Sequence, residues 1–258
     1  MADIPIPMPD ERAPVAATPP AAAPAAPEAE TAMTLVDHLG ELRTRIFRSV
    51  LAVGVGSAFG FAIANPVIKL LSAPVGGRLQ NLAPGDAFFI HVRIAVVVGV
   101  ILGMPVILYQ LWSFVAPGLT AEERRFIRPW VPIALVFFAL GCVIAYVVLP
   151  FAMAFLLSFD QDVFENRLAA APYFNFVTTL FLAFGLVMEF PIVLYALARV
   201  NIVNSTRLRS SRRYVILGIT IFATVVTPGG DIVSPLVLGL TMYVLYELTT
   251  WFIARGGR

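Results

Sequence analysis

The chain has 258 residues, of which 59% are hydrophobic and 13% are charged. A soluble globular chain is about half apolar and a quarter charged, so water cannot be the main solvent of this protein. Its net charge of +2 is too small to favour a nucleic-acid partner, and its single cysteine, Cys142, excludes an internal disulfide.

The first 33 residues are rich in Ala and Pro and have little apolar surface to bury. We therefore expect a disordered cytoplasmic tail at residues 1–33, followed by one membrane domain at residues 34–258. The tail lacks the basic start and the apolar run of a cleavable signal peptide. Membrane entry would then depend on the first spanning helix.

Residues Thr34 to Arg45 are predicted to form a short amphipathic helix ahead of the first span, with an apolar stripe and a polar stripe. Glu41 lies four residues before Arg45, which is the spacing of an ion pair on a helix. The simplest interpretation is an interfacial segment stabilised by this pair.

Six apolar runs approach the roughly 20 residues that a helix needs to cross a bilayer. They are Ser49–Ile68, Ile94–Pro117, Pro129–Pro150, Tyr173–Ala198, Tyr214–Pro228 and Ile232–Ala254. The fifth run is short, so we expect a thinned membrane or a tilted arrangement there. The tight turn Thr227–Asp231 makes the last two spans an antiparallel hairpin. The predicted fold is an all-α integral membrane protein with six transmembrane helices.

Cationic residues are distributed unevenly between alternate loops. One side holds Arg43, Arg45, Arg48, Arg124, Arg125, Arg128, Arg199, Arg207, Arg209, Arg212, Arg213, Arg255 and Arg258. The other side holds Lys69, Arg78, Arg93 and Arg167. Because retained loops are enriched in Lys and Arg, the first side is predicted to be cytoplasmic, together with both termini.

The second cytoplasmic loop breaks at Pro117-Gly118 and then restarts. Thr120 and Glu123 fit a capping box, in which the two side chains satisfy free amides of a helix. The acidic pair Glu122-Glu123, on the same loop as an exposed aromatic residue, Phe114, could also bind a cationic peptide. Carboxylates bind guanidinium through paired hydrogen bonds that lysine cannot reproduce. The residues alone leave both interpretations open.

Glu189 lies ten positions before Arg199, hence about 15 Å inside the membrane at 1.5 Å per residue. A carboxyl at that depth is costly and usually faces protein or a wet cavity, which favours a functional role. The alternative is a protonated side chain bonded to a neighbouring helix. Pro191 is expected to kink this helix, and Asp231 is explained as the N-cap of the last span.

The sequence offers no enzymatic machinery. A phosphate-binding loop needs a Gly-Lys pair, but the only lysine is Lys69 in Val-Ile-Lys-Leu-Leu. Zinc-protease and serine-hydrolase motifs are absent as well. The two histidines, His38 and His91, fall in opposite loops and cannot share a metal. We expect a protein that is not an enzyme and that holds neither a metal nor a cofactor.

Five segments resemble the TatC family, the multi-span component of the twin-arginine protein translocase. They are His38–Arg45 (His-Leu-Gly-Glu-Leu-Arg-Thr-Arg), Ser72–Pro74, Met104–Leu119 with Glu123–Arg125, Phe184–Pro191 and Thr227–Asp231. They occur in the family's order and with compatible spacing, and they cover the chain from about Thr34 to Arg258.

The resemblance implies a glove-shaped bundle in the bacterial inner membrane. It also implies a receptor that captures the twin-arginine signal peptides of folded cargo. TatA-type and TatB-type single-span partners would assemble on it, with several copies in the complex. The proton-motive force would drive transport without a bound cofactor.

The resemblance also implies roles for single residues. Signal-peptide binding would fall to Glu41, Phe114 and Glu123. Glu189 would lie in a polar concavity and contact a partner. The external, periplasmic cap would be shaped by Pro74 and Asp231.

A proton-coupled small-solute transporter is the alternative from another functional class, with Glu189 as its protonatable site. It would bind solutes but not signal peptides, and it would leave Glu41 and Glu123 as mere helix caps. The internal symmetry that marks many transporters is not visible between the halves of the chain.

Overall fold

The computed structural model describes residues 35–76, 79–120, 124–125, 129–158, 168–199, 202–227 and 231–255. The expected tail, residues 1–33, lies outside the described residues. The chain divides into two units, Met1–His38 and Leu39–Arg258, and the features below belong to the second unit. Regular structure in the described part is helical, apart from an isolated bridge between Gln80 and Ala169.

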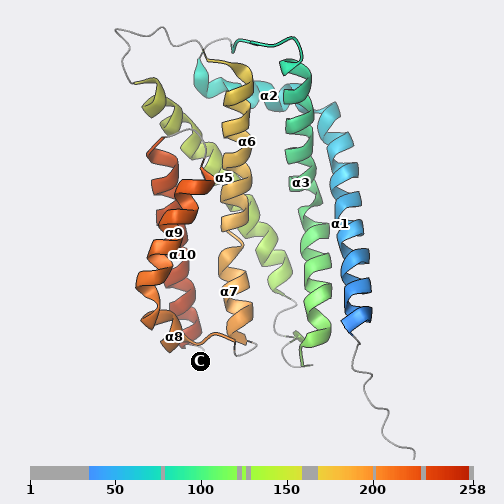
Figure 1. The fold of residues 1–258 in the computed structure, drawn as a ribbon, viewed down its shortest axis with the longest axis vertical. Helices are drawn as coiled ribbons and strands as arrows, with labels where there is room; N and C mark the ends of the chain where they lie inside the picture. The colour runs from blue at the N-terminus through green and yellow to red at the C-terminus, as the bar shows by residue number, and fades with distance from the viewer. Residues whose placement is uncertain are drawn as a thin grey trace, which may run out of the picture. The chain divides into compact units, whose positions relative to one another are not determined.

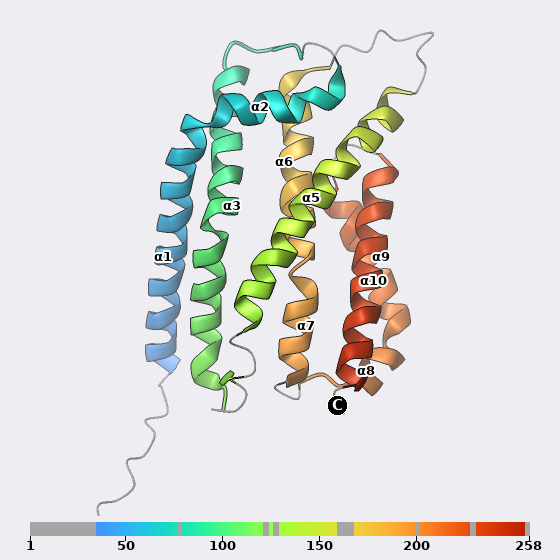
Figure 2. The ribbon, with the colours of Figure 1, turned by 180° about the vertical axis from the view of Figure 1, so that it is seen from behind.

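The described helices form a bundle of long, roughly aligned rods with one helix lying across its end (Figures 1 and 2). In chain order they are α1 (Leu35–Ala62), α2 (Ala64–Ser72), α3 (Asp86–Val115), α5 (Trp130–Leu157), α6 (Ala170–Val187), α7 (Phe190–Arg199), α8 (Ser205–Ser210), α9 (Arg212–Val226) and α10 (Val233–Arg255), with the 3-10 turns η1 (Ala73–Val75) and η2 (Ala116–Gly118). The crossing helix is α2 (Figure 2).

Five helical segments of the described chain are long and apolar enough to cross a membrane. They are Leu39–Ala62, Asp86–Val115, Trp130–Leu157, Ala170–Ala198 and Val233–Arg255. The predicted short run becomes α9, a helix of 15 residues, which is below the length of an ordinary crossing. The prediction of a helical membrane protein is therefore confirmed at this level.

The first helix differs from the sequence prediction in two places: it continues from Arg45 into the first span, and it ends at Ala62. A short helix over Thr34–Arg45 and a separate span over Ser49–Ile68 were expected, but α1 runs without interruption to Ala62 and α2 then leaves in a new direction. Pro66 explains the break, because it has no N–H to donate to the carbonyl of Ala62 and its ring would clash with that carbonyl. Because proline is uncharged, the presence of Pro66 does not interrupt the charge-free run from which the span was predicted.

Small residues bring α1 and α3 into close contact. A Cβ atom added to Gly56 would lie 2.8 Å from the carbonyl oxygen of Gly99, and one added to Gly60 would lie 2.6 Å from that of Ala95. Such distances leave room only for glycine, and small residues four apart are a common device for close helix packing in membranes. This α1–α3 seam fixes the register of the two helices.

A break between α6 and α7 occurs where Pro191 was expected to kink the chain. Helix α6 ends at Val187, and α7 begins at Phe190. The ring of Pro191 would meet the carbonyl of Val187, four residues earlier, so the regular hydrogen-bond ladder stops there. Glu189 lies in this break, and its own carbonyl accepts the amides of Ile192 and Val193, each at 3.1 Å. The predicted kink is confirmed.

The last two helices, α9 and α10, pack against each other as the hairpin prediction requires. Gly239 of α10 faces Ala223 and Ile219 of α9, and a Cβ added there would lie 3.7 Å from the Ala223 side chain. At the start of α10 the amide of Ser234 donates to Asp231 Oδ2 at 2.6 Å. The N-cap predicted for Asp231 is thus present.

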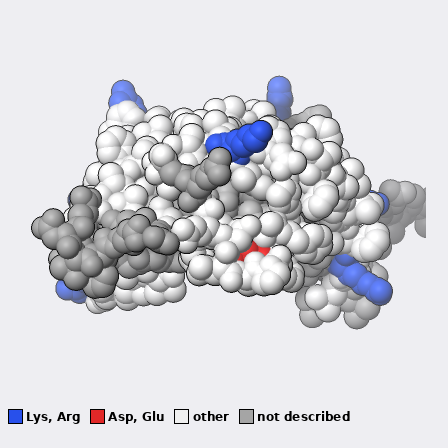
Figure 3. Space-filling view, turned by 90° about the horizontal axis from the view of Figure 1, so that it is seen from above, with Lys and Arg blue, Asp and Glu red and all other residues white. Residues whose placement is uncertain are grey.

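The bundle has two distinct ends. The "α8 end" carries α8, the first turns of α5 and α9, and the last turns of α3, α7 and α10 (Figure 1). The opposite "α2 end" carries α2 and the first turns of α3 and α6. Seen from the α2 end, the surface of the described residues is mostly uncharged, with a few basic side chains and one small acidic patch (Figure 3).

Candidate functional site

The predicted site residues fall in separate parts of the bundle. Glu41 and Phe114 belong to α1 and α3 at the α8 end, whereas Pro74 lies in η1 at the α2 end. Glu189 is inside the bundle at the α6–α7 break. Glu123 lies outside the described residues. The structure therefore brings two of the three predicted peptide-binding residues to the same end of the molecule.

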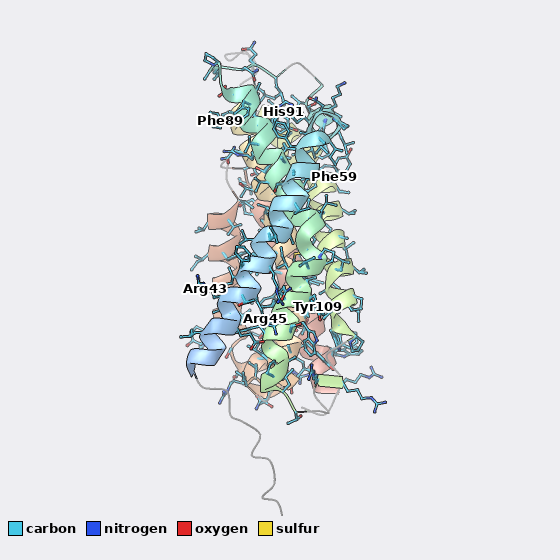
Figure 4. The ribbon with its side chains drawn as sticks, turned by 90° about the vertical axis from the view of Figure 1, so that its right-hand side faces the viewer. Arg43, Arg45, Phe59, Phe89, His91 and Tyr109 are labelled. Carbon is cyan, nitrogen blue, oxygen red and sulfur yellow. The ribbon has the colours of Figure 1, made fainter. Side chains whose placement is uncertain are left out.

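A polar network joins α1 to α3 at the α8 end. The Arg45 Nε–H donates to Glu41 Oε1 at 2.9 Å, and its Nη2 donates to the same oxygen. The Nη1 of Arg45 donates to Gln110 Oε1 of α3 at 3.4 Å. The Glu41–Arg45 pair predicted from sequence spacing is confirmed. Figure 4 shows Arg45 between the two helices and Arg43 on the other side of α1.

This network is only partly accessible to solvent. The side chains of Arg45 and Glu41 are 18% and 19% exposed, and Gln110 is 8% exposed. Glu41 Oε2 has no accessible surface and no hydrogen-bond partner among the described residues. One oxygen of the carboxylate is thus occupied by Arg45, while the other keeps an unused acceptor. An unused buried acceptor is unfavourable, so the carboxylate has capacity for a further donor.

Phe114 lies in the last turn of α3, four residues after Gln110, and therefore on the same face of the helix. It is half-buried, not exposed as the sequence suggested. In the loop that follows, the amide of Arg124 donates to the carbonyl of Thr120 at 2.9 Å. Both predicted roles of Glu123, completing a capping box and binding a ligand, stay predictions, because its position is not described.

Glu189 is buried, with 7% of its surface exposed. Its Oε1 has no accessible surface and no hydrogen-bond partner among the described residues. Nearby, Ile192 packs on an apolar cluster that contains Phe138 and Met104. This burial shows a carboxyl that faces protein, and the predicted polar concavity and functional role of Glu189 stay predictions. Across the described residues, no three His, Cys, Asp or Glu side chains come close enough to hold a metal ion.

Two polar features escaped the sequence interpretation. Gln110 is a single uncharged polar residue in an apolar run, and its link to Arg45 spans 65 positions of the chain. Arg212 Nη2 donates to Glu247 Oε2 at 2.5 Å, which ties α9 to α10 across 35 positions. No local pattern connects residues so far apart. The only available signal was that Gln110 and Glu247 interrupt apolar helices.

The predicted cap residues Pro74 and Asp231 occupy structural positions. Pro74 is half-buried in η1, directly after α2. The Tyr173 hydroxyl of α6 donates to the carbonyl of Leu71 at 2.5 Å and so holds α2 against the bundle. Asp231 is 5% exposed, and its Oδ1 has no hydrogen-bond partner in the described part of the chain. Its role beyond the N-cap stays a prediction.

Comparison with known proteins places these features in a family context. The sequence profile of the Sec-independent protein translocase protein (TatC) family matches residues 37–240. TatC of Carboxydothermus hydrogenoformans is 37% identical over 227 residues, which are 86% of this chain and 93% of that protein. Chloroplastic TATC of Arabidopsis thaliana is 40% identical over 230 residues, which are 88% of this chain and 68% of that protein.

A solved structure is also similar. The crystal structure of the twin arginine translocase receptor TatC in DDM superposes with a TM-score of 0.76 and 34% sequence identity. The superposition covers 84% of this chain and 99% of the crystallised chain. The likeness therefore extends over nearly all of the bundle.

Proposed function

Since this chain belongs to the TatC family of Sec-independent protein translocase proteins, we propose that it is the receptor subunit that binds twin-arginine signal peptides of folded cargo. The observation that carries this proposal is the Glu41 carboxylate at the α8 end, one buried oxygen of which has no hydrogen-bond partner in the described part of the chain. The name of the similar crystal structure, a twin arginine translocase receptor, supports the same function.

The chemistry of this end suits an arginine ligand. A carboxylate accepts paired, charge-assisted hydrogen bonds from the planar guanidinium fork, whereas an ammonium group offers only a point charge. Phe114, on the same face of α3 as Gln110, supplies apolar surface for the residues around the arginine pair. Glu123 provides the second carboxylate in the following loop. The two glutamates together match the two positive charges of the motif.

The proposed orientation places the α8 end in the cytoplasm. Its described arginines are Arg43, Arg45, Arg48, Arg124, Arg125, Arg199, Arg207, Arg209, Arg212, Arg213 and Arg255. The described α2 end offers only Lys69 and Arg93. The positive-inside rule then assigns both termini to the cytoplasmic side of a bacterial inner membrane. Helix α9 acts as a short sixth span, which needs a locally thinned bilayer.

Partners complete the translocase. TatA-type and TatB-type single-span proteins assemble on this chain in several copies, and the proton-motive force drives transport without a nucleotide or cofactor in this subunit. Glu189 is the polar contact for a partner helix, because its buried carboxyl has an oxygen with no hydrogen-bond partner among the described residues and can receive a donor. Pro74 and Asp231 shape the periplasmic cap.

Crosslinking locates the peptide directly. A photoreactive residue replaces Phe114 in one variant and Phe89, at the opposite end of α3, in the other. A short twin-arginine peptide is expected to crosslink at position 114 and not at position 89. Preferential crosslinking at position 89 would contradict the proposed site, and so would crosslinking at position 114 that an excess of unlabelled peptide fails to compete away.

A further inference from the structure

The Glu41 carboxylate is already occupied by an arginine of its own chain. We propose that Arg45 is a resident counter-ion, which the guanidinium of a bound signal peptide displaces from Glu41 and which Gln110 then holds. This inference rests on the proposed function and concerns the regulation of the same site. It assigns to Arg45 and Gln110 a role in setting the threshold for ligand binding.

The geometry closes both oxygens of Glu41 to an incoming ligand. Oε1 accepts two hydrogen bonds from Arg45, through Nε and Nη2. Oε2 has no accessible surface, although it lacks a hydrogen-bond partner among the described residues. A peptide arginine therefore cannot form its fork until side chains move. Because Arg45 makes the polar contacts to Glu41 in this network, its guanidinium is the group that has to leave.

Displacement is favoured over the simple addition of a second arginine. Two guanidinium groups on one carboxylate would hold like charges close together in a site that is less than one-fifth exposed, where screening by water is weak. In an exchange, one charge-assisted fork replaces another. The resident arginine lowers the affinity of every cationic ligand by the same factor, because each must break the same pair.

This common factor has a functional consequence. Cationic segments that bind weakly, including those with a lysine pair, then need a higher concentration to occupy the site and otherwise leave it empty. A paired-arginine peptide keeps enough affinity to bind, because its fork is intrinsically stronger. Arg45 thereby raises the threshold for binding without altering the intrinsic preference of the carboxylate.

Gln110 gives the released arginine a destination. Its Oε1 lies 3.4 Å from Arg45 Nη1, longer than an ordinary N–H···O hydrogen bond of about 2.9 Å, so there is room for the contact to tighten. A guanidinium left without an acceptor in a partly buried position would be costly. The α1–α3 seam holds Gln110 at this distance, because Gly56 and Gly99 fix the register of the two helices.

The test compares Arg45→Gln with Arg48→Gln in detergent-solubilised full-length protein. Both variants lose one positive charge from α1, but Arg48 is exposed, so its variant measures the general effect of charge. Affinities are measured for a twin-arginine peptide and its lysine-pair analogue. Relative to Arg48→Gln, Arg45→Gln is expected to raise the affinity for both peptides by the same factor. This factor should lie between about threefold and tenfold, which corresponds to the loss of one partly buried charged pair.

Two further variants separate the possible outcomes. Arg45→Lys keeps the charge but loses the planar guanidinium, so it should give an intermediate gain in peptide affinity. It replaces Arg45→Gln in the comparison if a parallel thermal melt shows that Arg45→Gln folds poorly. In a Glu41→Gln background, Arg45→Gln should have no effect beyond that of Arg48→Gln. If Arg45→Gln weakens twin-arginine binding or merely equals Arg48→Gln, while Glu41→Gln still reduces affinity, the exchange is wrong and the receptor proposal survives. If Glu41→Gln binds as well as native protein, the receptor site itself is wrong.

Discussion

Replacing Glu41 by glutamine tests the contribution of a single carboxylate to peptide binding. The variant loses the charge that a peptide guanidinium needs but keeps the size of the side chain and an amide oxygen. Hydrogen bonds to charged groups contribute about 1.5–3 kcal/mol, and every 1.4 kcal/mol is tenfold in affinity, so the carboxylate–guanidinium pair contributes roughly ten- to a hundredfold. Because the peptide must displace Arg45 from native Glu41, part of this gain is offset, and the variant should bind the twin-arginine peptide roughly three- to thirtyfold more weakly.

The effect on folding should be much smaller. The Glu41–Arg45 pair is 19% and 18% exposed, it joins neighbouring turns of one helix, and such a pair contributes about 1 kcal/mol to stability. Glutamine also retains an acceptor for Arg45. A thermal melt in the same detergent should therefore show little change, which separates lost binding from lost structure.

A matched control is available in the same molecule. Glu247 also pairs with an arginine, Arg212 at 2.5 Å, and its side chain is 28% exposed. Glu247→Gln removes the same charge away from the α1–α3 network, so peptide affinity should change by less than about twofold. Fluorescence anisotropy with a labelled peptide measures all three proteins. An equal fall in both variants would mean a general charge effect, and unchanged affinity in Glu41→Gln would refute the assignment of this carboxylate.

Three further predictions concern the remaining sites. Glu123→Gln should weaken twin-arginine binding roughly tenfold or more if the carboxylate holds a guanidinium, whereas a pure capping role, worth about 1 kcal/mol and also available to glutamine, predicts almost no change in anisotropy. Glu189→Ala should leave peptide capture intact in a pulldown but impair export, with Glu189→Gln milder because it retains hydrogen bonding; lost capture would contradict the separation of the two sites. In a Cys142→Ser background, a cysteine at Leu82 should react with an impermeant reagent from the periplasm and one at Arg124 only from the cytoplasm, and the reverse pattern would contradict the six-span topology.

The sequence predicted the helices well where apolar length and proline chemistry decide the outcome. Pro191 placed the break in the fourth long segment, because a missing N–H acts locally and can be located from its own position. The same chemistry acts at Pro66, but the run that contains it carries no charge and therefore looks continuous in the sequence. The end of α1 and the crossing helix α2 therefore appeared as one span.

The candidate site was predicted less completely than the fold. The Glu41–Arg45 pair follows from helical spacing alone, but its bond to Gln110 depends on the close α1–α3 seam between residues far apart in the chain. Phe114 is half-buried for a similar reason, because exposure is set by packing and not by residue type. Pairwise contacts between helices carry this information, and a single sequence does not reveal them.

The most direct test of the receptor function is the affinity of purified native protein for matched peptides that differ only in the cationic pair. A twin-arginine peptide should bind at least about tenfold more tightly than its lysine-pair analogue, because the ammonium group cannot form the planar fork on a carboxylate. Equal affinity for the two peptides would show that the protein recognises positive charge alone, and it would contradict a site built on glutamate–guanidinium pairing.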